Sequence, residues 1–225
     1  MATVVDIANL ALSRLGDRAT VTSISPPEGS AQADHVARFW PMARNTALEA
    51  APWRFATGRA APSLTSYETG NWAYAYFLPT DCLLVRRVMP PTSATNSGAI
   101  FDADAVVDAW DIRFDVETDD TGRKVLLTDQ EDAVVVYTRQ VVDPSKYTTA
   151  FTDAVARLLE SYLAGSVIKG QAGAKAAQLA YNAYMGLIAK AAVAEINQSN
   201  TRRDYTPSAM AARNVAFGNS RRVGR

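Results

Sequence analysis

Cysteine and histidine are nearly absent from this sequence of 225 residues, which has one of each, Cys82 and His35. A lone cysteine cannot form an internal disulfide bond, and a lone histidine leaves one candidate base for a Ser–His–Asp or Cys–His relay. The sequence also has no G-x-S-x-G nucleophile motif, P-loop, dinucleotide-binding motif or Cys/His zinc spacing. It therefore predicts no enzyme, no metal site and no cofactor, and we assign His35 and Cys82 no chemistry.

Net charge and long apolar runs are lacking as well. Lysine plus arginine number 23, as do aspartate plus glutamate, so no overall field marks the chain for nucleic acid or a membrane surface. The least polar stretch, 176–194, is interrupted by Gln178, Asn182 and Lys190, which predicts that it does not span a bilayer. The opening "MATVVDIANL" has no basic segment followed by an apolar one, so we expect no Sec export.

Helical patterns are present near the N-terminus. In "TVVDIANLALSRLG" the apolar residues form one stripe, which Thr3 can cap and Gly16 can end. A second helix is predicted from Ser30, with a kink at Pro41. We expect it to stop before Pro52, because a residue preceding proline avoids helical geometry.

Between about residues 64 and 142 the apolar period changes to two, which predicts strands. The segment "ETDDTGRK" has the composition of a hairpin turn, with Gly122 supplying the unusual backbone angle. We expect an exposed loop in "PPTSATNSGAIFDADAV", and its four acids lack the calcium-loop pattern, so a solvated loop is favoured over a metal site. These acids are Asp102, Asp104, Asp108 and Asp111.

Helical periodicity returns near residue 149, where Thr149 or Thr152 can cap a helix. Gly170 and Gly173 are expected to bracket a short break before a last helix that runs to about Asn197. That helix carries many alanines, which would let helix backbones approach closely.

The final segment, 199–225, is rich in arginine and cannot fold alone. It is either a disordered solubilising tail or an arm that orders against a partner through arginines and apolar anchors. The candidate docking residues are Arg202, Arg203, Tyr205, Met210, Arg213, Phe217, Arg221 and Arg222.

The expected fold class is α+β: a four-helix bundle formed by N- and C-terminal helices, with an inserted, mostly antiparallel β-sheet and an extended C-terminal arm. The corresponding regions are 1–63 for the first helices, 64–145 for the β-rich insertion, 146–198 for the last helices and 199–225 for the basic arm.

Three segments in the first ninety residues resemble, in order, the podophage tail tubular protein A family, also called the adaptor or head-to-tail connector. They are "IANLALSRLGD" with "VTSI", then "AQADHVARFWPMARNTALEAAPWRFATGRAAP", and then "NWAYAYFLPTDCLLVRRV". The resemblance implies a structural virion protein at the portal vertex. It further implies a dodecameric ring between the portal protein and the tail nozzle protein, whose channel passes the genome without sequence-specific binding.

The resemblance also implies that "PWRFATGRA" closes the long helix and leads into the sheet. Trp53 and Phe55 would then pack in the core at the helix–sheet junction, with Arg54 and Arg59 at the surface or a subunit boundary.

Two other hypotheses remain: a virion-associated polysaccharide or cell-wall hydrolase, and a DNA-binding module with a basic tail. The zero net charge and the missing catalytic motifs favour the adaptor over both.

Overall fold

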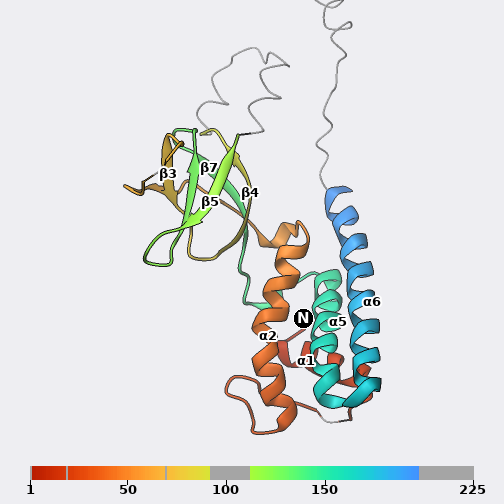
Figure 1. The fold of residues 1–225 in the computed structure, drawn as a ribbon. Helices are drawn as coiled ribbons and strands as arrows, with labels where there is room; N and C mark the ends of the chain where they lie inside the picture. The colour runs from red at the N-terminus through yellow and green to blue at the C-terminus, as the bar shows by residue number, and fades with distance from the viewer. Residues whose placement is uncertain (1, 19, 69, 92–111, 198–225) are drawn as a thin grey trace, which may run out of the picture.

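The computed structural model describes residues 2–18, 20–68, 70–91 and 112–197. These residues form a helical part and a β part, and the β part is inserted in the chain between α2 and α5 (Figure 1). The helices are α1 (Val4–Arg14), α2 (Ala31–Ala50), α5 (Thr149–Val167) and α6 (Gly170–Asn197), with short 3-10 turns at Arg54–Ala56 and Pro144–Lys146. The strands are β1 (Thr57–Ala60), β2 (Ser63–Leu64), β3 (Tyr74–Phe77), β4 (Cys82–Met89), β5 (Phe114–Thr118), β6 (Lys124–Thr128) and β7 (Val134–Arg139).

The first two helices begin where their capping residues predict. Thr3 forms a capping box with Asp6, and the Ser30 hydroxyl accepts the backbone N–H of Ala33. Helix α2 continues through Pro41 and ends at Ala50. The predicted start and end of this helix are therefore confirmed.

The last two helices begin slightly differently from the prediction. Thr148, rather than Thr149 or Thr152, caps α5 through the backbone N–H of Phe151. The break before α6 falls at Ile168 and Lys169, and Gly173 already lies inside α6.

The predicted four-helix bundle with one inserted sheet is wrong. In the described residues α5 is the common partner, because α1, α2 and α6 each pack against it. In a four-helix bundle all four helices lie side by side around one core. Helix α1 has only 11 residues whereas α6 has 28, so α1 cannot follow the other helices along their length.

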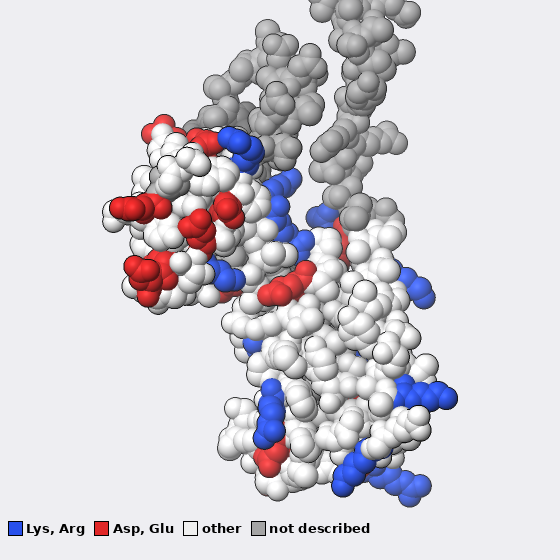
Figure 2. Space-filling model, viewed as in Figure 1, with Lys and Arg blue, Asp and Glu red and all other residues white. Residues whose placement is uncertain are grey.

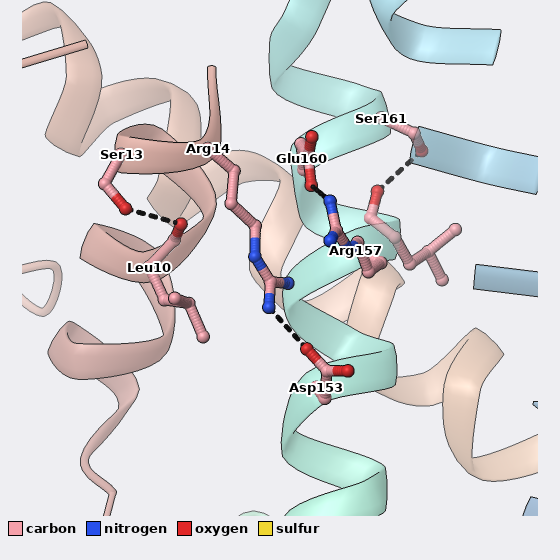
Figure 3. Close-up of polar contacts among 8 residues, drawn as sticks. Leu10, Ser13, Arg14, Asp153, Arg157, Glu160 and Ser161 are labelled. Carbon is pink, nitrogen blue, oxygen red and sulfur yellow. Dashed lines mark hydrogen bonds and ion pairs between the residues drawn. The ribbon is translucent and has the colours of Figure 1, made fainter. Parts of the chain in front are cut away.

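The helical core is apolar, with polar contacts at its margin. Ile7 and Leu12 of α1 and Leu158 and Leu159 of α5 are among its fully buried side chains. At the margin, Arg14 of α1 forms an ion pair with Asp153 of α5, while Arg157 pairs with Glu160 within α5 (Figure 3). Because the first pair joins residues 139 positions apart in the chain, it helps to fix α1 on α5.

The strands form two antiparallel sheets, where a single sheet was expected. One has the order β1-β7-β4 and the other the order β2-β3-β6-β5. Pro62 lies between β1 and β2 and cannot donate a ladder hydrogen bond, so the chain leaves the first sheet there and enters the second. The hairpin expected between β5 and β6 is confirmed, with Gly122 at φ +81°.

The two sheets pack against each other through one apolar cluster. Tyr76 and Leu126 come from the β2-β3-β6-β5 sheet, and Val88, Val135 and Tyr137 from the other. The face of the β1-β7-β4 sheet that points away from this cluster is therefore the one turned toward the helical part.

Candidate functional site

Trp53 lies at the junction between the helical and β parts and is 0% exposed. Its indole Nε1 donates a hydrogen bond of 2.7 Å to the carbonyl of Ala47. That carbonyl belongs to the last turn of α2, where backbone acceptors have no partner within the helix. Trp53 therefore both fills the core and satisfies the end of α2.

Phe55 is half-buried and belongs to an aromatic cluster around Trp53. Its ring centroid lies 6.0 Å from that of Trp53, 5.0 Å from that of Phe151 and 5.8 Å from that of Tyr147. Phe151 also meets Trp53 edge to face at 5.1 Å. The cluster joins the α2–β1 connection to the start of α5.

A cleft of about 310 Å³ lies beside this junction, between the outer face of the β1-β7-β4 sheet and the last turns of α6. In Figure 2, basic side chains gather on the side of the β part that faces α6. We call this the arginine cleft, and its charged residues are Arg54, Arg59, Arg86, Arg87 and Glu195.

Strand register places two of these arginines in one row. Arg59 of β1 and Arg87 of β4 are both paired with Val136 of the central strand β7. Two strand spacings separate these two residues by roughly 10 Å, so they lie on the same face of the sheet, on either side of Val136.

A β-bulge adds a third arginine to the same face. Adjacent residues of a regular strand point to opposite faces, but the register shifts between Val85 and Arg87. Arg86 thus donates to the hydroxyl of Thr138 and to the carbonyl of Ala51 just after α2, both at 2.7 Å. Burial lowers the pKa of the Arg86 guanidinium, which nevertheless stays charged at neutral pH.

Glu195 brings the end of α6 to the cleft. It is buried, and its carboxylate accepts the backbone N–H of Arg54 at 3.1 Å. The Arg54 side chain in turn donates to the backbone carbonyl of Glu195 at 3.4 Å. These contacts hold α6 against the connection between α2 and β1.

The arginine cleft has the chemistry of an anion-binding site. Arg54, Arg59 and Arg86 line the cleft together with the single carboxylate of Glu195, so among these described residues positive charge exceeds negative charge. A guanidinium presents several N–H donors in one plane and matches the two oxygens of a carboxylate. The described lining of the cleft thus offers groups that bind anions.

The residues assigned no chemistry lie apart from this cleft. His35 is half-buried on α2, and Cys82 is buried at the start of β4. Burial raises the pKa of the Cys82 thiol to about 11, so at neutral pH it is protonated and a poor nucleophile. Asp102, Asp104, Asp108 and Asp111 lie outside the described residues, as do all the docking residues predicted in 199–225.

The sequence placed Arg54 and Arg59 at the surface, and both are exposed. It missed Arg86, Arg87 and Glu195. Two adjacent arginines inside the apolar run "LLVRRVM" were a signal for a bulge, and Glu195 is the only acid in α6.

A second surface is the outward side of α6. Lys175, Lys190 and Glu195 are the only charged residues among its 28. Its large exposed apolar side chains include Leu179 at 61% and Val193 at 59% exposure, together with Tyr181 and Met185.

In comparisons with known proteins, no family model matches the chain, and no curated protein matches it significantly. Within the described residues, no group of three or more His, Cys, Asp or Glu side chains could hold a metal ion. None of the described helices has the length and apolar character needed to cross a membrane.

Proposed function

We propose that this chain is a structural virion protein, the subunit of an adaptor ring that joins the portal to the tail nozzle of a podophage. The observation that carries the proposal is the exposed apolar side of α6. The resemblance of the first ninety residues to the tail tubular protein A family supports the same function.

The side of α6 is suited to contact with another protein. Leu179, Tyr181, Met185 and Val193 each keep roughly half of their surface in water. Burying that remainder contributes about 1 kcal/mol for each side chain, and few charges would have to lose water on contact. The occupant that we assign to this surface is a neighbouring copy of the chain.

A ring follows when each copy uses two different surfaces, one for each neighbour. In a twelve-membered ring, two rims remain for the portal and the nozzle, and the central channel passes the genome without base recognition. Such a protein needs recognition surfaces and no catalytic site.

The test is the mass of the purified chain, alone and after mixing with portal protein. The chain has a mass of 24.3 kDa, so a dodecamer would be about 290 kDa. Met185→Lys should disrupt the ring, whereas Val142→Lys, at another exposed apolar residue that lies outside α6, should not. A wild-type chain that stays monomeric and does not bind portal would refute the proposal.

Two further variants separate the adaptor from the hydrolase. His35→Ala and Cys82→Ser should leave assembly and infectivity unchanged, because neither residue has chemistry in the adaptor. A selective loss of polysaccharide cleavage in either variant would instead favour the enzyme.

A further inference from the structure

We propose that the arginine cleft of one copy receives the acidic hairpin formed by β5 and β6 of a neighbouring copy. This inference rests on the proposed self-assembly and names the polar contact that would accompany the α6 surface. It predicts a head-to-tail contact in which one side of the chain recognises a different side of its neighbour.

The hairpin presents carboxylates to solvent, while its two cations are engaged within the molecule: Arg123 lies over the Phe77 ring, and Lys124 donates to the carbonyls of Cys82 and Leu83. Asp115 and Glu117 on β5 are exposed, and so is Asp120 in the turn. β5 lies at the end of the strand order β2-β3-β6-β5, and Asp115 and Glu117, two residues apart, point to the same face of that sheet.

The turn of the hairpin is fixed before any contact forms. One oxygen of Asp119 accepts the backbone N–H groups of Thr121 and Arg123, at 2.9 and 2.7 Å, as well as the Thr121 hydroxyl. These bonds lower the pKa of the Asp119 carboxyl. Because the turn is already ordered, docking costs little conformational entropy.

The two charged surfaces lie on different sides of the molecule. Figure 2 shows acidic side chains on the part of the β region turned away from α6, and basic ones on the part facing α6. In Figure 1, β5 runs toward the side remote from α6. Because the basic and acidic surfaces lie on opposite sides, the acidic surface of each copy can meet the basic surface of the next. The chain as a whole has a net charge of zero.

The form of the cleft favours a carboxylate over a phosphate. Glu195 is already in the cleft, and it repels a doubly charged phosphate more strongly than a single carboxylate. The cleft volume of about 310 Å³ lies at the lower end of the range for ligand pockets. It can therefore admit side chains from a turn but not a second helix.

Reciprocal charge reversal tests the contact in the full chain. Arg59→Glu changes an exposed residue of the cleft, and Asp120→Lys changes an exposed residue of the hairpin. We expect each variant alone to weaken assembly at least tenfold at low salt. Arg18→Glu and Glu131→Lys make the same charge changes at exposed positions outside the cleft, the hairpin and α6, and should assemble like the wild type.

The decisive result is the restoration of assembly by a second reversal. Mixing Arg59→Glu chains with Asp120→Lys chains should restore a ring of alternating copies, because each hairpin then meets a cleft of opposite charge. The double variant should also assemble by itself. Thermal unfolding of each variant by circular dichroism should match that of the wild type, which shows that the lost assembly is not lost folding.

Other outcomes would overturn the inference. If wild-type chains form rings and both single variants do so equally well, the cleft contact is refuted while the adaptor proposal stands. If Arg59→Glu assembles normally but loses binding to a fluorescent DNA duplex, the cleft is a phosphate site. If the wild type never assembles, the proposed function fails and the inference fails with it.

Discussion

Replacing Trp53 by alanine should destabilise the fold and abolish assembly together. The side chain is fully buried among Phe55 and Phe151, and its indole satisfies the Ala47 carbonyl at the end of α2. The substitution would therefore remove an aromatic ring from the core and a hydrogen bond from the helix end.

The magnitude follows from these two losses. A large aromatic side chain buries about 200 Å² of surface, which corresponds to about 5 kcal/mol at 25 cal/mol per Å². Because alanine still buries part of this surface and the site can partly collapse, the expected cost is about 3–5 kcal/mol. Trp53→Phe keeps most of the ring but leaves the Ala47 carbonyl without its partner, which should cost about 1–3 kcal/mol.

The assay is urea unfolding followed by far-ultraviolet circular dichroism, with the mass of the assembly measured on the same samples. Trp72→Ala is the matched control, since Trp72 is half-buried beside Arg113 on the outer face of the other sheet. It should cost less than Trp53→Ala. If Trp53→Ala unfolds like the wild type yet loses only partner binding, Trp53 would be a docking residue and its assignment to the core would be wrong.

Three more predictions concern the helix contact, the buried tyrosines and the last segment. Gly173→Ala should lower the melting temperature, because the new Cβ would lie 2.9 Å from the backbone carbonyl oxygen of Ala164 on α5. Burial raises the pKa of Tyr147 and Tyr184 from 10.0 to about 12. The unfolding free energy measured against pH should therefore be unaffected by them below pH 10 and should fall between pH 10 and 12, where only the unfolded chain readily loses these protons. Deleting 199–225 should leave thermal unfolding unchanged and weaken ring or portal attachment in a pull-down assay, and unchanged attachment would refute its role as a docking arm.

The local features of the fold could be predicted from the sequence. Thr3 and Ser30 identified the starts of α1 and α2, because a cap acts on backbone groups only three residues away. Gly122 identified the hairpin turn for a similarly local reason.

The arrangement of these elements in space could not be predicted in the same way. An apolar stripe shows that α1 has a partner, but it does not show that this partner is α5. The split into two sheets depends on β1 pairing with β7, which lies far along the chain, whereas β2 pairs with the next strand, β3. The two-residue strand β2 was too short to have a period.

The candidate site likewise has some residues that the sequence predicted and others that only the folded chain brings together. The sequence supplied Arg54 and Arg59, but the cleft also needs Arg86, which a bulge turns toward the helices. It needs Glu195 as well, from α6, which begins only at Gly170.

The end of α2 is held by side chains from two directions: the indole of Trp53 on Ala47 and the guanidinium of Arg86 on Ala51. The chain also crosses between the helical and β parts twice, once after α2 and once before α5. Two crossings resist twisting, and Arg86 ties the β part directly to the helix end. We therefore expect the helical and β parts to move as one rigid body. A force applied to the sheets would then be transmitted to α2 along the helix axis.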